Sequence, residues 1–471
     1  MPKVEPKTRV TKTKATAEVV AVRECIVLTT PLAGTPVFAE VVFAGGARGV
    51  VWQIDTDGLE ILLLNNQPVR AGELVALQSE SISLPVGKGI VGRVIDPLGK
   101  PLDGRGYLAT SSQAPYFRSA PNFQERDDLN EQLVTGVSYV DTLLPIVKGQ
   151  RIAIMGDSKS GKTSFMTQVA IAQAKSGKSV VYVLIAKRRI EVNRLVEVFK
   201  KAGVMQHITL VVTVAGESLP LGVLAPYAGC AVAEYFWYQK KDVVVLYDDF
   251  SNFAKLYREM SLLLRNNAGR EAYPGDMFHV QSALLERAGK LKATGFSQTI
   301  LVAGATPNND LTGYQATSLI SMTDGQIVFD TEILRRGIMP AININLSVSR
   351  IGGRSQNPTM QQLSAKVMQE LSNFRSAEEY TRFSDQMSDF AQQEIEIGRQ
   401  LTESLSQEPN DFFSLPQQRA MIEVVLGNKG AGQLDIVKLK RLVQKKLPIH
   451  KPQSDEVVTK LIAKTLKDGV A

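Results

Sequence analysis

The amino-acid sequence predicts a multi-domain protein: a central α/β domain with a mostly parallel sheet, preceded by a β domain and followed by an α-helical domain. Three observations predict it. Val- and Ile-rich segments with turn residues come first, apolar strands alternating with amphipathic helices follow, and the last part has helical periodicity alone. A chain of 471 residues, 44% of them hydrophobic, can bury several cores at about 100–200 residues per domain.

The N-terminal β domain is expected over residues 16–84. Its segments "AEVVAVRECIVLTT" and "PVFAEVVFAGGARGVVWQI" are rich in Val and Ile, and "PLAGTP" and "DTDG" punctuate them. Short strands at this spacing are typical of a small barrel or a sandwich.

The central domain is expected over residues 85–352 and the α-helical domain over 353–471. Helix-like segments such as "EVNRLVEVFKKAG" separate the apolar runs of the central domain, which predicts a parallel sheet covered on both faces. The runs are "RIAIM", "SVVYVLIA", "ITLVVTVA", "DVVVLYDD" and "QTILVAGA". After residue 353 the strands stop, and segments such as "MQQLSAKVMQELSNFRSAEEYTRF" have the period of a helix.

Composition excludes several classes of protein. The net charge of +7 comes from Lys and Arg spread along the chain, so we expect no nucleic-acid partner; the basic residues 1–15 are expected to form a disordered tail. Cys25 and Cys230 are far apart and the three His residues are scattered, which indicates reduced thiols and no metal cluster. No signal peptide and no apolar run of about 20 residues is present, so we expect a soluble, intracellular protein.

One glycine-rich motif is misleading. Residues 87–92, "GKGIVG", fit the G-x-G-x-x-G pattern of dinucleotide sites, which requires a strand before it and a helix after it. Here a β-and-turn sequence, "RVIDPLGKPLDG", follows. Glycines for tight turns therefore explain this motif better than a nicotinamide or flavin site.

A stronger motif is "GDSKSGKT", which follows the run "RIAIM" and precedes a helical segment. It is the complete P-loop pattern, in which glycines let backbone N–H groups curl around phosphate oxygens at a helix N-terminus. Lys162 is expected to reach the β- and γ-phosphates, and Thr163 to bind Mg²⁺. We expect the nucleotide to be held by Gly156, Asp157, Ser158, Lys159, Ser160, Gly161, Lys162 and Thr163.

Two further groups are expected at the ends of other strands. "DVVVLYDD" ends in two carboxylates, and Asp248 is expected to bind Mg²⁺ beside the P-loop. A water-activating carboxylate would be expected on the run "SVVYVLIA", as the neighbour of the P-loop strand, but this run leads into Lys187 and two arginines. Glu191 is expected in the following helix. The sequence thus predicts a protein that holds phosphate without activating water for hydrolysis.

Longer stretches resemble the α subunit of F-type ATP synthases, the noncatalytic nucleotide-binding subunit of the F1 head. They follow the family's order along nearly the whole chain, and "GREAYPGD" and "TDGQI" are specific to α rather than to the catalytic β subunit. The stretches are "LLPIVKGQR", "GDSKSGKTS", "LAPYAGCAVAEYF", "LYDDFSNFAKLYREMSLLLRNNAGREAYPGDMFHVQSALLERAGK", "SMTDGQIVFDTEILRRGIMPAININLSVSR" and "GRQLTESL".

The resemblance implies a β-barrel, a P-loop α/β domain and a helical domain, in a hexameric ring where α and β subunits alternate around the γ central stalk. The chain would hold ATP or ADP with Mg²⁺ at a noncatalytic site, with Gln407 beside the adenine. By its position in "SVSR", Arg350 would act at the neighbouring β site, where an arginine supplied in trans stabilises charge on the transferring phosphoryl group. Ser347 would hold that turn, and Ser321 would lie at the same interface.

It also implies further partners and a location. The head would meet a δ/peripheral stalk and an F0 sector that transports H⁺ or Na⁺, and it would be peripheral to the cytoplasmic face of a bacterial plasma membrane. The sequence has no Arg/Ser-rich leader, which favours a bacterial over a mitochondrial origin.

Three departures from the family pattern concern the nucleotide site. Lys187 stands where the family usually has Gln, "SKS" replaces "RQT" inside the P-loop, and Pro409 replaces the second glutamine that flanks adenine. We expect a cation at position 187 either to pair with phosphate or to disturb the Mg²⁺ site.

Two other functions fit part of the pattern. A self-sufficient homohexameric ATPase, of the secretion or helicase type, would need a water-activating Glu near Lys187. A nucleotide-binding module without coupled chemistry would need no partner. A co-purifying β-like subunit would favour the resemblance, and ATPase activity of the chain alone would favour the homohexamer.

Overall fold

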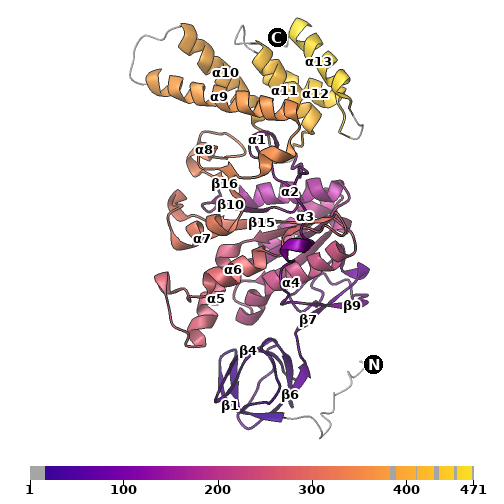
Figure 1. Cartoon of the computed structure of the whole chain (residues 1–471), viewed down its shortest axis with the longest axis vertical. Helices are drawn as coiled ribbons and strands as arrows, with labels where there is room; N and C mark the ends of the chain where they lie inside the picture. Colours follow the sequence, from indigo (N-terminus) through magenta and orange to yellow (C-terminus); the bar gives the residue numbers. More distant parts are fainter. Residues whose placement is uncertain (1–15, 382–388, 410, 429–433, 450–452, 469–471) are drawn as a thin grey trace. The chain divides into compact units, whose positions relative to one another are not determined.

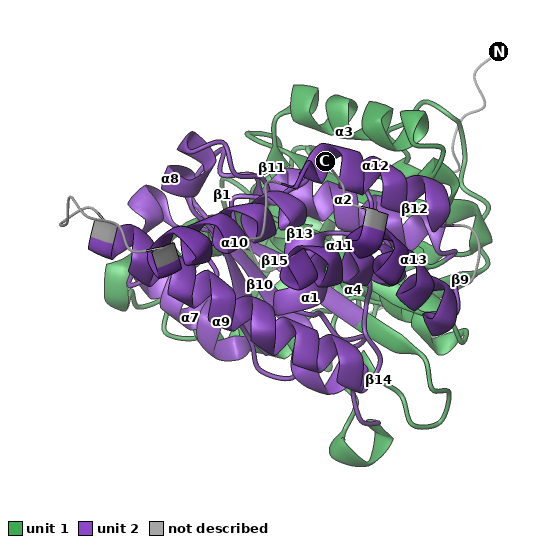
Figure 2. Ribbon diagram, turned by 90° about the horizontal axis from the view of Figure 1, so that it is seen from above, with its two compact units in different colours: residues 1–126, 178–298 green, residues 127–177, 299–471 purple. Residues whose placement is uncertain are grey.

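The computed structural model describes residues 16–381, 389–409, 411–428, 434–449 and 453–468; the tail expected at residues 1–15 lies outside them. Figure 1 shows the helices and strands coloured along the sequence. The chain divides into two compact units, coloured separately in Figure 2: unit 1 combines residues 1–126 with 178–298, and unit 2 combines 127–177 with 299–471. Each unit has its own part of the central α/β domain.

The N-terminal strands of unit 1 form a closed antiparallel barrel in the order β1-β2-β5-β4-β3-β6. These strands are β1 (Thr16–Arg23), β2 (Ile26–Thr29), β3 (Glu40–Phe43), β4 (Arg48–Asp55), β5 (Gly58–Leu63) and β6 (Leu74–Ser79). Val27, Val41 and Ile61 fill the barrel's core, as the alternation of apolar residues predicts. Gly58 begins β5 because a Cβ there would lie 1.7 Å from the carbonyl oxygen of Thr29. The barrel, rather than the sandwich, is therefore the observed form.

The α/β part of unit 1 has a parallel run of strands in the order β13-β11-β12-β8. The strands are β8 (Val94–Ile95), β11 (Ser179–Lys187), β12 (Ile208–Val214) and β13 (Val243–Asp248); the helices are α3 (Arg189–Lys201), α4 (Leu219–Tyr238), α5 (Phe250–Leu263) and α6 (Met277–Leu285). A pair, β7 (Ser83–Val86) and β9 (Ser112–Pro115), and the short β14 (Gly289–Lys290) complete this unit's strands. Gly229 lets α4 approach β11, since a Cβ there would lie 2.2 Å from Val183 Cγ2.

The segment 87–92 lies in this unit between β7 and β8 and leads into a strand, so it lacks the helix that a dinucleotide site requires. Its glycines allow a close backbone approach and a positive φ value. A Cβ at Gly89 would lie 2.5 Å from the carbonyl oxygen of Ala109, and Gly92 has φ +77°. The explanation by tight turns is confirmed.

One helix among the described residues, α4, is long and apolar enough by length and composition to cross a membrane, but 83% of that stretch is buried inside the structure. It also carries Glu234, which pairs with Arg287. We conclude that α4 is a core helix of unit 1.

Unit 2 contains the P-loop strand β10 (Arg151–Gly156), which pairs in parallel with β15 (Ser297–Ala305) on one side and β16 (Gly325–Phe329) on the other. The short β17 (Val348–Ser349) pairs antiparallel with β16. The prediction that residues 179–186 neighbour the P-loop strand is wrong, because strands that come later in the chain take both places beside β10. Chain order alone does not fix strand order in a sheet with crossover connections.

Helices complete unit 2. Four accompany its strands: α1 (Ser138–Leu143), α2 (Lys162–Lys175), α7 (Tyr314–Met322) and α8 (Thr331–Arg335). The C-terminal helices are α9 (Pro358–Thr381), α10 (Asp389–Leu405), α11 (Leu415–Asn428), α12 (Ile436–Lys446) and α13 (Asp455–Asp468). The predicted fold class, a barrel, an α/β domain with a mostly parallel sheet and a helical domain, is confirmed. The domain boundaries at residues 84/85 and 352/353 stay predictions.

Candidate functional site

The predicted P-loop joins the end of β10 to the start of α2 in unit 2, as the sequence motif requires. Gly156 has φ +156°, and a Cβ there would lie 2.7 Å from Ser160 Oγ and 2.8 Å from the carbonyl oxygen of Phe329. Lys159 and Gly161 also have positive φ values, of +61° and +111°. The loop therefore curls tightly enough to present its backbone N–H groups at the N-terminus of a 14-residue helix.

The side chains of this loop suit an anionic ligand. Lys162 Nζ donates to the carbonyl oxygens of Gly156 and Asp157, each at 2.7 Å, so its ammonium is held over the loop. Asp157 accepts hydrogen bonds from the backbone N–H groups of Ser158 and Asn308, so it ties the P-loop to the segment after β15. Ser160 Oγ is buried and has no hydrogen-bond partner within the described residues. This orphaned hydroxyl, the helix N-terminus and the ammonium fit a phosphate group.

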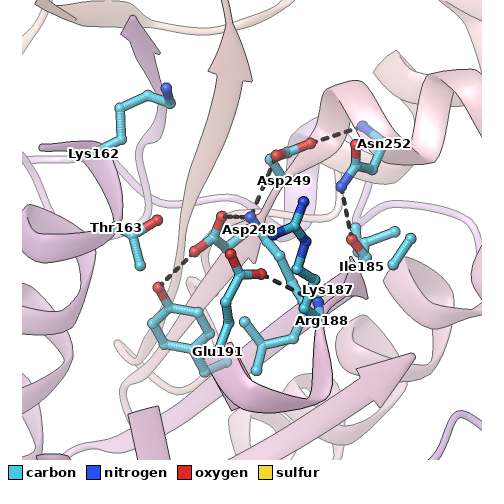
Figure 3. A network of polar contacts seen from close by, with 12 residues as sticks. Lys162, Thr163, Ile185, Lys187, Arg188, Glu191, Asp248, Asp249 and Asn252 are labelled. Atoms are coloured by element: carbon cyan, nitrogen blue, oxygen red, sulfur yellow. Dashed lines mark hydrogen bonds and ion pairs between the residues drawn. The ribbon is translucent and has the colours of Figure 1, made fainter. Parts of the chain in front are cut away.

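Asp248, the expected metal ligand, ends β13 in unit 1, and its side chain is only 3% exposed. One carboxylate oxygen pairs with Lys187 Nζ at 2.6 Å, and the other accepts from the hydroxyl of Tyr182 at 3.1 Å. Figure 3 shows this network with the Lys187 ammonium between Asp248 and Asp249. Burial lowers the pKa of Lys187, but attraction to the two aspartates outweighs it, so the net pKa is raised and the lysine stays charged.

The neighbouring carboxylates of this network have structural partners. Asp249 caps helix α5 by accepting from the N–H of Asn252 at 2.7 Å, and it lies 3.4 Å from Lys187 Nζ. Glu191 lies in α3, as predicted, where it accepts from the N–H of Arg188 and closes a capping box. A carboxylate committed to capping its own helix is poorly placed to activate water.

The residues present do not fit a magnesium ion at Asp248. An ammonium within 2.6 Å of the carboxylate already supplies the charge that a divalent cation would supply. No group of three or more His, Cys, Asp or Glu that could hold a metal occurs among the described residues. Joint binding of Mg²⁺ by Thr163 and Asp248 stays a prediction.

Ser347 and Arg350 lie together at the edge of unit 2, around strand β17. Ser347 Oγ donates to the carbonyl oxygen of Asn343 and accepts from the N–H of Val328, so it ties its turn to β16. The exposed Arg350 donates to the carbonyl oxygen of Thr323. Ser321 is also exposed, on α7, and donates to the carbonyl oxygen of Thr317. These contacts leave Arg350 on the surface, where an arginine that acts on a partner must be.

Gln407, expected beside the adenine, is 7% exposed in unit 2. Its amide oxygen accepts from the N–H of Ser138, and its amide nitrogen donates to the carbonyl oxygens of Gly136 and Asp411. In this structure the side chain therefore fastens the segment after α10 to the loop before α1. A contact with a base stays a prediction.

The sequence interpretation missed the partners of Lys187. Asp249 and Tyr182 were not singled out, although the doublet "DD" after one strand and a lysine after another were both visible. Their meeting depends on β11 and β13 being paired neighbours, with Leu184 opposite Asp248. Opposite charges at the ends of these two strands therefore predict a pair only once the pairing of the strands is known.

Comparisons with known proteins agree with this fold. Residues 136–349 match the family described as "ATP synthase alpha/beta family, nucleotide-binding domain", and residues 356–470 match "ATP synthase alpha/beta chain, C terminal domain".

Several relatives cover most of the chain, and each is named "ATP synthase subunit alpha". The protein of Aquifex aeolicus is 38% identical over 82% of this chain and 77% of its own length. The protein of Neorickettsia sennetsu is 37% identical over 88% and 83%, and that of Dictyoglomus thermophilum 36% over 89% and 83%. With such identity over most of both chains, this chain belongs to the ATP synthase alpha-subunit family.

Proposed function

We propose that this chain is the alpha subunit of a rotary F-type ATP synthase, that it holds ATP or ADP at a noncatalytic site, and that it supplies Arg350 to a neighbouring catalytic β subunit. The observation that carries the noncatalytic part is the pair between Lys187 and Asp248. The ammonium of Lys187 cannot accept a proton from water, and Asp248 is already paired with it.

The P-loop supports the nucleotide-binding part. Its backbone N–H groups and the N-terminus of α2 would receive phosphate oxygens, and Lys162 would exchange its two carbonyl contacts for the β- and γ-phosphates. Nucleotides supply the phosphate charge that the ammonium and the helix N-terminus attract.

The remaining carboxylates of the network support the absence of hydrolysis. Asp248 and Asp249 pair with Lys187, and Glu191 caps α3. A water molecule attacks phosphate only when a group accepts or orients its proton, and each of these three carboxylates already serves another partner.

Arg350 supports the role at a partner's site. Arg350 is an exposed residue, one terminal nitrogen of its guanidinium donates to the carbonyl oxygen of Thr323, and it follows a turn that Ser347 ties to β16. A planar guanidinium on a rigid turn is suited to stabilise the charge that develops on a transferring phosphoryl group.

The complex follows from the family. The chain would alternate with β subunits in a hexameric ring around γ, meet the δ/peripheral stalk, and couple ATP synthesis or hydrolysis to H⁺ or Na⁺ transport through F0 at the cytoplasmic face of a bacterial membrane. A homohexameric secretion-type or helicase-type ATPase is not favoured, since the relatives reported above are named as ATP synthase alpha subunits.

Two measurements on the purified chain test the proposal. Equilibrium binding of a fluorescent ATP analogue should be strong for the wild type and at least about tenfold weaker for Lys162→Ala, because alanine cannot replace a charged donor to phosphate. Lys175→Ala, at the exposed end of the same helix, is the matched control and should bind normally. Robust ATP turnover by the chain alone, lost in Lys162→Ala, would contradict the noncatalytic assignment.

A further inference from the structure

We infer that a cavity within unit 1 is a binding site for a small organic ammonium ion, meaning a protonated amine that carries an apolar group. The cavity measures about 540 Å³, a size typical of small-molecule sites. Its lining comes from the barrel, from the segment after β9, and from helices α4, α5 and α6 with the residues just after α6, all of them in unit 1. None of the lining residues belongs to the P-loop, so the inference goes beyond the proposed function.

Aromatic rings form much of the cavity wall. Phe38 and Phe117 stack with their ring centroids 3.8 Å apart, and Trp52 lies edge-on to both rings. Tyr227 tilts against Phe117 at a centroid distance of 4.7 Å. The faces of such rings attract cations as well as apolar groups, by about 0.5–2 kcal/mol for a cation placed over a ring. The wall therefore suits a ligand that has both an apolar part and a positive charge.

The carboxylate of Asp276 lines the same cavity and has no cation paired with it among the described residues. One of its oxygens accepts a hydrogen bond from the hydroxyl of Tyr257 at 2.7 Å. Asp276 precedes helix α6 as its N-cap residue, but its side chain accepts no hydrogen bond from the helix N–H groups. It therefore keeps an acceptor oxygen for a ligand, and a hydrogen bond from an ammonium to a carboxylate is of the strong, charge-assisted kind.

The hydroxyl of Tyr227 is a second, independent observation that points to a ligand. Tyr227 is only 8% exposed, and no described residue makes a hydrogen bond with its hydroxyl. Burial raises the pKa of Tyr227, the positive charge of Arg287 lowers it, and the negative charge of Asp276 raises it, so the net pKa is raised and the hydroxyl stays neutral. A buried hydroxyl without a partner costs free energy, and an ammonium N–H can donate to it.

The two arginines that line the cavity do not neutralise Asp276. Arg287 donates to both carboxylate oxygens of Glu234, at 2.7 and 2.8 Å, so its charge is already balanced. Arg118 is an exposed residue, and its guanidinium lies 4.3 Å from the centroid of the Tyr238 ring, which is not part of the cavity lining. The carboxylate of Asp276 thus favours a cation over an anion as the ligand.

The test is equilibrium binding to the full-length chain, measured by titration calorimetry with two probes of similar shape. The probes are 2-phenylethylamine, which is protonated at neutral pH, and the uncharged 2-phenylethanol. The wild type should bind the amine at least about tenfold more tightly than the alcohol. Asp276→Asn keeps an acceptor for Tyr257 but removes the negative charge, and it should lose at least about tenfold in affinity for the amine. Tyr227→Phe removes only the hydroxyl and should lose about three- to tenfold.

The matched control is Glu286→Gln, which removes an exposed carboxylate at the other end of α6; Glu286 does not line the cavity, and the variant should bind like the wild type. Three results would overturn the inference: no binding of the amine, equal affinity for the two probes, or unchanged affinity for the amine in Asp276→Asn or Tyr227→Phe. If one variant does not fold, the comparison of the two probes on the wild type and the other variant still decide the result.

Discussion

Asp141, in helix α1, is the carboxyl group of unit 2 whose ionisation the structure perturbs most plainly. It is fully buried and accepts hydrogen bonds from Thr135, from the N–H of Gly136 and from the amide of Gln418. Burial raises its pKa to about 6, and these hydrogen bonds offset only part of the rise. An ionised Asp141 therefore costs the folded state free energy.

The sign of the pH dependence follows from this raised pKa. Between about pH 4 and pH 6 the folded state keeps the proton that the unfolded state has lost, so stability falls as pH rises through this window, by about 3 kcal/mol in total. Asp141→Asn removes the titration. In urea denaturation at several pH values, the wild type should lose stability relative to the variant as pH rises. Parallel profiles for the two proteins would contradict the assignment.

Sequence alone predicted the P-loop residues because their pattern is contiguous and its physics is local. Glycines at 156 and 161 are needed for a curled loop, and the positive φ values confirm that reason. The pair between Lys187 and Asp248 was out of reach because it depends on which strands are paired and on a bulge in β11. The sequence shows that Lys187 replaces the family's usual glutamine, but it does not show that Lys187 pairs with Asp248.

The P-loop as an element depends on the absence of a side chain at position 156. A Cβ there would meet Ser160 Oγ at 2.7 Å and backbone and side-chain atoms of Phe329 within 3 Å, at a φ of +156°. We expect Gly156→Ala to destabilise unit 2 by about 1–3 kcal/mol and to weaken nucleotide binding at least about tenfold. Thermal denaturation and analogue binding measure the two effects.

The control for this substitution is Gly313→Ala, just before α7. Gly313 has no atom within 4 Å of its added Cβ and no positive φ. This variant should keep nucleotide binding and lose at most about 1 kcal/mol of stability, because Gly313 is the N-cap of α7, where glycine is preferred to alanine. Unchanged nucleotide affinity in Gly156→Ala would mean that the loop's curl is not required.

Helix α4 is held in unit 1 by a buried ion pair. Glu234 bonds Arg287 through both carboxylate oxygens, at 2.7 and 2.8 Å, and the side chains are 3% and 2% exposed. Glu234→Ala leaves a buried guanidinium without its anion, and we expect it to cost about 3–5 kcal/mol of stability. The exposed pair of Glu197 and Lys200 gives the comparison: Glu197→Ala should cost at most about 1 kcal/mol. Equal shifts in the urea midpoint would contradict this account.

At the scale of elements, periodicity predicted what the strands and helices are, but not how the strands are ordered. The β-rich start, the alternating centre and the helical end all appear as expected. The order around β10 does not, because β15 and β16 take the places where residues 179–186 were expected. Apolar strands of similar composition pair equally well in several orders, so hydrophobicity carries little information on neighbours.

At the scale of the whole molecule, the family is secure because identity of 36–38% extends over most of the chain. Composition and periodicity could not have supplied it, since they indicate only the class of fold. The family was indicated instead by sequence motifs that occur in a fixed order along the chain. The proposal that this chain supplies Arg350 while a β subunit carries out catalysis concerns two chains. It can be tested only in an assembled complex.

Arg350 offers the most direct test of that division. On the proposed function, Arg350→Ala should lower the steady-state ATPase activity of head complexes reconstituted with a β subunit by about 10³-fold or more, because the guanidinium would act on charge that builds up in the transition state. The variant chain alone should keep its own nucleotide affinity. Arg350→Lys should rescue little, since a point charge lacks the planar fork. If the Arg350→Ala complex turned over at the wild-type rate, or if the chain lost its own nucleotide instead, the central claim would be wrong.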